Sequence, residues 1–467
     1  MGFWNVERYG ELVAAIDSRS GQIWTYADLA RDAASIGAML PETGRKSLGL
    51  LLVGNRYESL AEYIAALKAD AAVILLDEAL NSGLLEEFIE AYRPNWILSS
   101  DPCRQVCGYH HAEIPRLLMR DSSDVAEIHP DLALMLSTSG STGSPKLVRL
   151  TRRNLASNAE AIAQYLNLTA VERPITALPM AYSYGLSVIG SHLSVGASIV
   201  LTEDGVLRRE FWDALERYEC TSFAGVPYTY QMLLQAGLLK TKGASIRTLT
   251  QAGGRLDDRA IEQVYRLAKQ RGWRFFVMYG QTEAAPRMSY VPFERLGEKI
   301  GSVGVPIPGG SFQIDDETGE LIYSGPNVMM GYAETREDLV RGDDVGGVLR
   351  TGDLARLDSE GYCYITGRLK RFLKLFGKRL NLDDVERILV SRTGSAVVCF
   401  GKDDRLVCAT AACGDPQAIA HAACEIFALP KAAVKAIALE QFPLLANGKL
   451  DYQRLAQIEA STLAART

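Results

Sequence analysis

Short apolar runs alternate with amphipathic segments over residues 22–100. The runs SLGLLLVG (47–54) and AAVILLD (71–77) have the composition of buried strands. The segments YADLARDAASIGAML (26–40), which Thr25 can cap, and ESLAEYIAALKAD (58–70) have the apolar spacing of helices. Repeated strand–helix units predict a mostly parallel sheet flanked by helices, and so an α/β fold. In such sheets ligands bind beyond the carboxyl ends of the strands.

The pattern changes from about residue 300. Residues 300–332 are rich in Gly and Pro and contain short alternating strands, which predicts a small β subdomain. The charged stretch around 368–379 is typical of a solvated face or of a linker between compact regions. The last ~95 residues have the segment count of a small α+β domain.

Composition narrows the class of protein. The 467 residues are 48% hydrophobic and 23% charged, which indicates a globular chain of two or three domains. A formal net charge of −6 argues against a dedicated nucleic-acid binder. No apolar run reaches the length of a membrane span, and the start of the chain lacks the apolar core of a signal peptide. Scattered cysteines, several in apolar runs, favour reduced thiols and a cytoplasmic location.

One stretch carries the strongest candidate chemistry. An apolar run ending at Leu136 is followed by small or hydroxylated residues up to Ser144 and then by Lys146, in the sequence LSTSGSTGSPK. Small residues admit a bulky anion close to the backbone, and the lysine adds a mobile cation, as a polyphosphate site requires. The stretch is not a Walker A loop, and by composition alone a linker or turn is the alternative.

A second candidate is the strand FFVMYG, which breaks into Gln281, Thr282 and Glu283. Together with Tyr279 these residues can stack on a base, bond a phosphate and hold Mg²⁺ through oxygen; the alternative is an ordinary capped turn. The segment CRQVCGYHH (103–111) contains four potential zinc ligands, but their spacing is cramped for a tetrahedral site, and a solvated loop is the favoured interpretation.

Six motifs occur together along the chain. They are TSGSTGSPK (138–146), YGQTE (279–283), GEL…GP…GY (319–332), RTGDL (350–354), GRLKRFLKLFGKRLNLDDVE (367–386) and PLLANGK (443–449). In this order and spacing the chain resembles the acyl-adenylate-forming (AMP-binding) superfamily, which includes acyl-CoA synthetases, peptide synthetase adenylation domains and luciferases.

The resemblance implies roles for individual residues. A phosphate loop would bind the β- and γ-phosphates of ATP through Thr138, Ser139, Gly140, Ser141, Thr142, Gly143 and Lys146. The rest of the nucleotide would be bound by Gly253, Gly254, Tyr279, Gly280, Gln281, Thr282, Asp353 and Arg368. Among these, Tyr279 would stack on adenine, Thr282 would contact the α-phosphate and Asp353 would bind the ribose hydroxyls. Glu283 would hold Mg²⁺, and Lys449 would reach the site for adenylation.

The resemblance also implies domain motion. It places a large AMP-binding domain at 1–368, a hinge at 369–370 that includes Lys370, and a small C-terminal α+β domain at 371–467. Lys374 and Gly377 would face the thiol in the second half-reaction, after rotation of the small domain.

The acyl pocket departs from the pattern of several relatives. Its predicted lining is Tyr182, Tyr184, Gly185, Tyr228 and Met278, although aromatic residues at such spacing are also common in a plain core. Tyr182 stands where many acyl-CoA synthetases have His, and Gly185 where amino-acid-activating domains have Asp. A buried ammonium needs a partner charge, so an ordinary α-amino acid is disfavoured as substrate.

The expected activity is therefore ATP- and Mg²⁺-dependent conversion of a small carboxylic acid to acyl-AMP, with transfer to coenzyme A. One alternative is the loading of phosphopantetheine on a separate carrier protein. An alternative of another class is a non-catalytic binding or scaffold protein. The acid, the thiol acceptor and the oligomeric state are left open by the sequence.

Overall fold

The computed structural model describes residues 2–41, 45–112, 114–122, 127–137, 146–369, 371–375, 378–402, 405–411, 414–427, 429–445 and 450–464. The chain divides into two compact units, which are residues 1–311 with 323–349, and residues 312–322 with 350–467. The predicted boundary at residue 368 and the predicted hinge at Lys370 stay predictions, and Lys370 lies outside the described residues.

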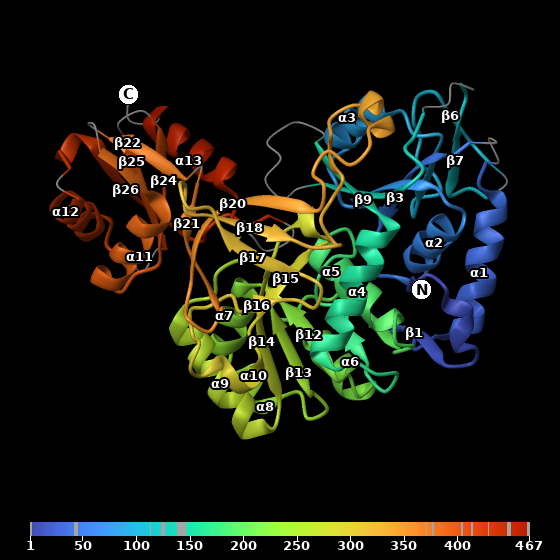
Figure 1. Ribbon diagram of the computed structural model, residues 1–467, viewed down its shortest axis with the longest axis horizontal. Helices are drawn as coiled ribbons and strands as arrows, with labels where there is room; N and C mark the ends of the chain where they lie inside the picture. The colour runs from blue at the N-terminus through green and yellow to red at the C-terminus, as the bar shows by residue number, and fades with distance from the viewer. Residues whose placement is uncertain are drawn as a thin grey trace. The chain divides into compact units, whose positions relative to one another are not determined.

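The first unit contains a nine-stranded sheet in the order β16-β15-β14-β13-β12-β10-β11-β1-β2 (Figure 1). Its strands are β1 (Val13–Asp17), β2 (Ile23–Thr25), β10 (Pro174–Ile175), β11 (Ile199–Leu201), β12 (Ser222–Gly225), β13 (Thr248–Gln251), β14 (Arg274–Gly280), β15 (Arg287–Tyr290) and β16 (Val305–Pro306). The six strands from β1 to β14 in the sheet order are parallel, whereas β2, β15 and β16 are antiparallel additions.

A second, eight-stranded sheet has the order β19-β9-β8-β4-β3-β5-β7-β6. Its strands are β3 (Leu48–Val53), β4 (Ala72–Asp77), β5 (Trp96–Ser99), β6 (Tyr109–His111), β7 (Leu117–Arg120), β8 (Leu132–Ser137), β9 (Leu147–Thr151) and β19 (Gly331–Ala333). Strands β8, β4, β3 and β5 are parallel, as the apolar runs predict. The α/β fold is confirmed.

Helices cover both sheets. In the first unit they are α1 (Tyr26–Met39), α2 (Tyr57–Lys68), α3 (Ser82–Tyr92), α4 (Arg152–Leu166), α5 (Ser183–Leu193), α6 (Arg209–Arg217), α7 (Pro227–Gln235), α8 (Leu238–Thr241), α9 (Asp258–Arg271) and α10 (Phe293–Leu296). Helix α1 begins where predicted, because the Thr25 hydroxyl accepts a hydrogen bond from Asp28 N at 3.0 Å in a capping box.

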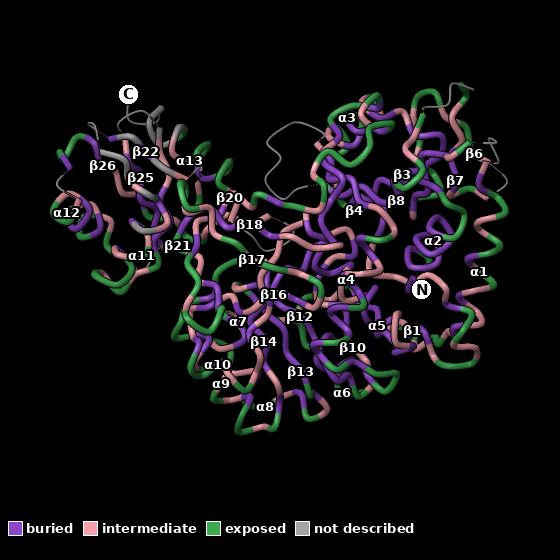
Figure 2. The backbone as a smooth tube through the Cα atoms, in the orientation of Figure 1, coloured by how far each residue is buried: buried purple, intermediate pink, exposed green. Residues whose placement is uncertain are grey.

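Helices α4 and α5 lie side by side between the two sheets (Figure 1). Tyr165 of α4 and Tyr184 of α5 face strands β12–β14, while Leu155 of α4 and Leu186 of α5 face Leu136 and Leu150 of β8 and β9. Figure 2 shows that the strands of both sheets are largely buried. The two helices thus connect the sheets through a shared apolar core.

A four-stranded sheet has the order β17-β18-β20-β21 and consists of short strands from the Gly- and Pro-rich region onward. They are β17 (Ser311–Ile314), β18 (Glu320–Ser324), β20 (Val348–Leu357) and β21 (Cys363–Arg368). The second unit also contains the hairpin β22 (Phe372–Leu375) and β23 (Lys378–Asn381), and the sheet β24 (Val397–Lys402), β25 (Arg405–Ala411) and β26 (Val434–Leu439). Its helices are α11 (Leu382–Thr393), α12 (Pro416–Phe427) and α13 (Tyr452–Ala464).

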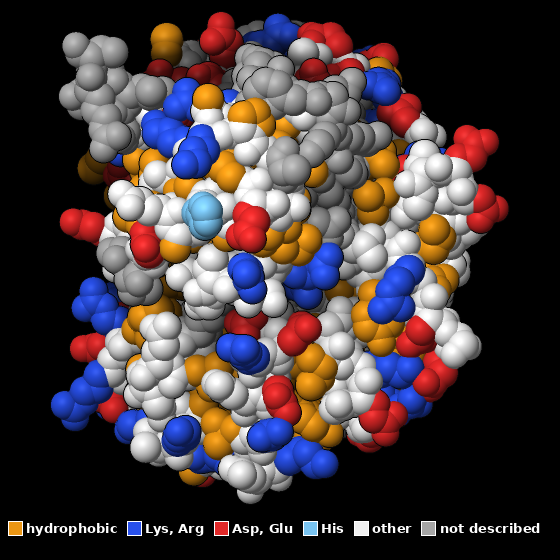
Figure 3. Space-filling model, turned by 90° about the vertical axis from the view of Figure 1, so that its left-hand side faces the viewer, with side chains coloured by type: hydrophobic (Ala, Val, Ile, Leu, Met, Phe, Trp, Pro, Cys, Tyr) orange, Lys and Arg blue, Asp and Glu red, His pale blue; other side chains and the backbone are white. Residues whose placement is uncertain are grey.

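The structure can be compared with two expectations from the sequence, which concern membrane-spanning segments and basic surface areas. No helix in the described ranges is both long and apolar enough to cross a membrane. On the face drawn in Figure 3, basic and acidic side chains are interspersed rather than gathered into one basic area. In the segment predicted to be a solvated loop, Cys103 and Cys107 are exposed, and His110 of β6 bonds Asp121.

Candidate functional site

The candidate site lies at the carboxyl end of β14. Tyr279 and Gly280 end this strand, and Thr282–Ala284 form a single 3-10 turn that begins after Gln281. Gly280 pairs with Arg287 of β15, and a Cβ at residue 280 would lie 2.0 Å from the Pro286 carbonyl oxygen. Only glycine permits this close approach, so the tight return of the chain depends on it.

Two buried asparagines hold the turn. Asn327 Nδ2 donates to the carbonyl oxygens of Ala284 at 2.6 Å and Arg287 at 2.8 Å. Asn158 Nδ2, from α4, donates to the Arg287 carbonyl at 2.9 Å and to the Ala284 carbonyl at 3.4 Å. Because buried carbonyls need donors, these amides fix the backbone that presents Thr282 and Glu283.

Tyr332 joins two of the predicted catalytic residues. Its hydroxyl donates to Glu283 Oε1 at 2.9 Å, and Lys146 Nζ lies 3.8 Å from the centroid of its ring. Burial raises the pKa of Tyr332, and the Glu283 charge adds to the shift, so the phenol stays protonated and acts as a donor. Lys146 Nζ is also 3.9 Å from Glu334 Oε1. Tyr332 therefore contacts the Lys146 cation through its ring and the Glu283 carboxylate through its hydroxyl.

This arrangement suits a metal-bound polyphosphate. Glu283 Oε1 accepts the hydrogen bond from Tyr332, and the other carboxylate oxygen of Glu283 can ligate a cation. Within the described ranges no group of three or more His, Cys, Asp and Glu side chains is placed to hold a metal. A single carboxylate is the protein contribution expected for Mg²⁺, which retains waters and takes its other ligands from phosphates.

The predicted glycine pair lies close to the aromatic segment before α5. Gly253 has a φ of +86°, and a Cβ there would lie 2.6 Å from the Tyr182 hydroxyl oxygen. At the start of α5, Ser183 Oγ is 3.1 Å from Thr282 Oγ1. The structure thus brings the ends of β13 and β14 together with the start of α5, as the candidate site requires.

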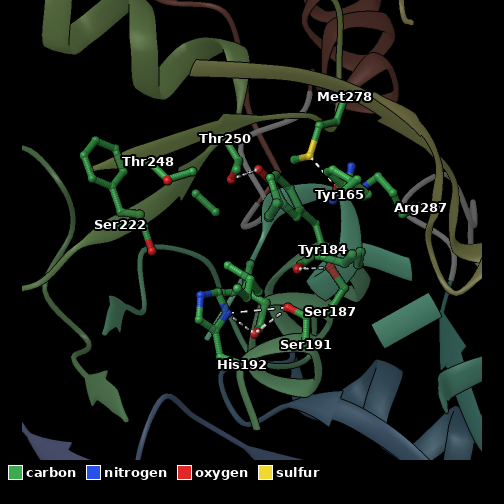
Figure 4. Close-up of a pocket in the computed structure, with 16 residues that line it drawn as sticks. Tyr165, Tyr184, Ser187, Ser191, His192, Ser222, Thr248, Thr250, Met278 and Arg287 are labelled. Carbon is green, nitrogen blue, oxygen red and sulfur yellow. Dashed lines mark hydrogen bonds between the residues drawn. The ribbon is translucent and has the colours of Figure 1, made fainter. Parts of the chain in front are cut away.

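A small cavity lies between strands β12–β14 and helices α4 and α5 (Figure 4). Tyr184 and Met278 line it, whereas Tyr228 is 38% exposed and is not among its lining residues. Tyr182 packs against Tyr184 with ring centroids 6.2 Å apart. Burial raises the pKa of Tyr182 to about 12. The predicted acyl-pocket residues are therefore only partly gathered around this cavity.

Gly185 is explained by packing. A Cβ at this position would lie 2.3 Å from the Pro179 carbonyl oxygen. An aspartate, which amino-acid-activating domains carry here by the resemblance, would not fit without movement of the backbone. The structure thus gives a steric reason for the departure noted in the sequence.

Asp353 and Arg368 belong to the second unit. They face each other across β20 and β21, and Arg368 Nε donates to Asp353 Oδ1 at 3.1 Å. The Asp353 side chain is 8% exposed and that of Arg368 is 67% exposed. The two residues thus form an ion pair with each other, while their contact with a ribose stays a prediction.

Several predicted site residues cannot be placed. Outside the described residues lie Thr138, Ser139, Gly140, Ser141, Thr142, Gly143, Lys370, Gly377 and Lys449. Lys374 lies in β22, and its side chain is outside the description as well. Their roles remain expectations from the resemblance.

Four residues of the site were missed by sequence reasoning. Tyr332, Asn158, Asn327 and Arg287 contact or hold the turn but belong to no assignment made above. Tyr332 ends the GEL…GP…GY motif, so a signal for it was present. The asparagines gave no comparable signal, because their partners are distant in sequence.

Comparison with known proteins agrees with this geometry. The model of the family described as AMP-binding enzyme matches residues 3–333. An oxalate–CoA ligase of Arabidopsis thaliana is 31% identical over 299 residues, 61% of this chain, and the match spans 57% of that relative's length. A 2-succinylbenzoate–CoA ligase of Bacillus pumilus is 27% identical over 405 residues, covering 82% of this chain and 81% of the relative.

Solved structures show the same fold. The o-succinylbenzoate coenzyme A synthetase (MenE) of Bacillus subtilis, in complex with ATP and magnesium ion, has a TM-score of 0.76 and 23% identity. The match covers 96% of this chain and 98% of that one. MatB of Rhodopseudomonas palustris, bound to ATP, has a TM-score of 0.78 and 23% identity over 98% of this chain and 99% of that one.

Proposed function

The chain belongs to the family of AMP-binding enzymes, and from this we propose that it activates a carboxylic acid with ATP and transfers the acyl group to coenzyme A. The relatives named above are CoA ligases, which supports coenzyme A as the acceptor. Their acids, oxalate and 2-succinylbenzoate, differ too much to identify the acid used here.

The observation that carries the proposal is the Lys146–Tyr332–Glu283 cluster beside Thr282. Lys146 would supply a cation for phosphate oxygens, and Glu283 would supply a carboxylate for Mg²⁺. The half-buried Tyr332 contacts both side chains. Both charges are needed for a nucleotide triphosphate, because the phosphate chain is anionic and carries a divalent cation.

In the first half-reaction a carboxylate oxygen of the acid bonds to the α-phosphorus of ATP. The bond from that phosphorus to the bridging oxygen breaks, and pyrophosphate leaves. Negative charge grows on the α-phosphate and the leaving group, where Thr282, Lys146 and Lys449 would donate. When bound with ATP, Mg²⁺ neutralises part of the charge on the phosphate oxygens.

In the second half-reaction a deprotonated thiol attacks the acyl carbon, and AMP leaves. We propose that the small domain rotates about Lys370 between the two steps and brings Lys374 and Gly377 toward the thiol. Asp353 with Arg368, and Tyr279 with Gly253 and Gly254, are proposed as ribose and adenine contacts. The same proposal includes the domain boundaries, with the large domain ending at residue 368 and the small domain beginning at residue 371.

Pyrophosphate release in the presence of ATP, Mg²⁺ and a panel of carboxylic acids tests the activity. The proposal expects release that depends on the acid, and a scaffold protein would give none with any acid. Adding coenzyme A or, separately, a holo carrier protein then identifies the acceptor. Acyl-CoA formation supports the proposal, whereas acylation of the carrier alone would replace it with the carrier-loading function.

A further inference from the structure

The cavity behind the candidate site is small for an acyl pocket, and its wall is mostly apolar with a few polar groups. Its volume is about 20 Å³, the room of one or two water molecules. Hydroxyl groups from Ser187, Ser222 and Thr250 line it together with the side chains of Tyr184 and Arg287 (Figure 4). An extended alkyl chain or an aromatic ring has no matching space here.

Arg287 is the unusual group in this lining. The residue is only 2% exposed, and its guanidinium lies over the Tyr184 ring with Cζ 4.6 Å from the centroid. Among the described residues its Nε is buried with no hydrogen-bond partner, and no carboxylate there forms an ion pair with it. A guanidinium stays charged at all relevant pH values, so burial without a counter-charge is costly.

Arg149 shows how this chain otherwise pairs a fully buried guanidinium. Its side chain is 0% exposed, and Nη2 lies 2.6 Å from Asp344 Oδ2. Further nitrogen atoms of Arg149 donate to backbone carbonyls, including that of Tyr332 at 3.2 Å. Arg287 is similarly buried and has a hydrogen bond with the neutral Tyr165 hydroxyl, but no carboxylate of the described residues pairs with it, so its positive charge is left without a counter-charge there.

The backbone of Arg287 is fixed, so its side chain is held at the cavity. The carbonyl oxygen of Arg287 accepts from Asn158 and Asn327, and the residue pairs with Gly280 in the adjacent strand. Thr282, the proposed α-phosphate contact, follows two residues after Gly280. The guanidinium is therefore carried by the strand next to the one that leads into the reacting centre.

The opposite side of the cavity is unsuited to an anion. His192 Nδ1 lies 2.8 Å from the Val188 carbonyl oxygen, which can only accept, so Nδ1 carries the proton. Burial lowers the pKa of His192 to about 4, and its buried Nε2 is a neutral acceptor that has no hydrogen-bond partner among the described residues. Figure 4 shows Arg287 and His192 on opposite sides of the lining. An anionic group in the cavity would thus be directed to Arg287.

We propose that Arg287 is a specificity residue that pairs with a second carboxylate of the substrate, so that the enzyme acts on compact dicarboxylic acids. This inference rests on the proposed adenylation activity. One carboxylate would react near Thr282, and the other would enter the cavity and supply the counter-charge of Arg287. Because the neutral Tyr184 ring contacts only the flat face of the Arg287 guanidinium, the N–H groups along the edge of the guanidinium can donate to the carboxylate.

The test compares each short dicarboxylic acid with its monomethyl ester, which has the same chain but one carboxylate. The wild-type protein is assayed by pyrophosphate release, together with Arg287→Met and Arg287→Lys. We expect the wild type to prefer succinate or malonate over the ester by about 100-fold in kcat/KM. Arg287→Met should lose most of this preference, mainly through KM for the diacid, and Arg287→Lys should retain part of it.

Binding gives a second readout that does not require turnover. Titration calorimetry with the diacid should give a dissociation constant about 100-fold weaker for Arg287→Met than for the wild type. The ester should bind both proteins alike. The Lys variant and the diacid–ester comparison on the wild type keep the test decisive if the Met variant does not fold.

The outcomes separate the two claims. If no acid of any class supports pyrophosphate release, the proposed function fails. If monocarboxylic acids are activated and the diacids are not, the proposed function stands and the inference is overturned. An equal loss for diacids and esters in Arg287→Met would also overturn it, because Arg287 would then only support the turn.

Discussion

Replacement of Tyr332 by Phe removes a single hydroxyl from the candidate site. That hydroxyl donates to Glu283 Oε1 at 2.9 Å, while the ring beneath Lys146 Nζ, 3.8 Å from its centroid, is retained in the variant. The change therefore separates the support of Glu283 from the position of Lys146.

The expected magnitude follows from the kind of bond that is lost. A hydrogen bond to a charged group contributes about 1.5–3 kcal/mol. If Glu283 holds Mg²⁺ with ATP, loss of this orienting donor should lower kcat/KM for MgATP by about 10- to 100-fold. KM for the acid should change little, because Tyr332 is not among the residues that line the cavity. Since Glu283 is only half-buried, water can replace the donor, and the free energy of unfolding should fall by about 1 kcal/mol or less.

Tyr92→Phe is the matched control. The Tyr92 hydroxyl donates to the carbonyl of Ala333, the next residue in β19, at 2.8 Å. This substitution also removes a tyrosine hydroxyl bonded to the strand, but it leaves Glu283 and Lys146 untouched. Steady-state pyrophosphate release at varied MgATP, with thermal unfolding of both variants, provides the measurement. Unchanged MgATP kinetics in Tyr332→Phe, or an equal loss in Tyr92→Phe, would refute the reasoning.

Three further predictions follow from other parts of the chain. Asn327→Ala removes one of the two side-chain donors to the Ala284 and Arg287 carbonyls. It should lower the free energy of unfolding by about 2 kcal/mol and the rate of pyrophosphate release at least tenfold, as measured by denaturant unfolding and the same assay. Full activity at reduced stability would contradict its positioning role. Lys449→Ala should abolish acyl-AMP formation yet spare thioester formation from supplied acyl-AMP, and an equal loss of both half-reactions would show the assignment to be wrong. Burial raises the pKa of Glu62 to about 7 despite Arg116 Nη1 at 3.1 Å, so the folded protein retains a proton that the unfolded chain releases near pH 4.5. Stability should fall as pH rises from about 4.5 to 7, and Glu62→Gln should raise the melting temperature more at pH 8 than at pH 5; a gain independent of pH would contradict the shift.

The regular elements could be predicted because their signal is local. The apolar runs at 47–54 and 71–77 became β3 and β4, and the amphipathic segments at 26–40 and 58–70 became α1 and α2. Burial of one face or of a whole strand leaves a periodic pattern in the residues themselves. The break after β14 was predicted for the same reason, because the strand ends in residues typical of a turn.

The contacts that build the site could not be predicted in this way. Tyr332 and Glu283 are separated by 49 positions, and Asn158 and Arg287 by 129. Nothing in the local sequence specifies such pairs, since they depend on how the sheets and α4 pack. That no carboxylate in the described part of the chain pairs with Arg287 is likewise visible only once its surroundings are known. Tyr228, which its spacing suggested for the acyl pocket, is 38% exposed and does not line the cavity between α4 and α5, so its role in the pocket stays a prediction.

The central claim is that a carboxylate oxygen attacks the α-phosphorus of ATP, and isotope transfer tests it most directly. The enzyme is incubated with ATP, Mg²⁺, coenzyme A and an acid whose carboxylate is labelled with ¹⁸O, and the phosphate products are analysed by mass spectrometry. The account predicts one ¹⁸O atom in the AMP that is released and none in the pyrophosphate. Label in inorganic phosphate with formation of ADP, or AMP without label, would contradict it.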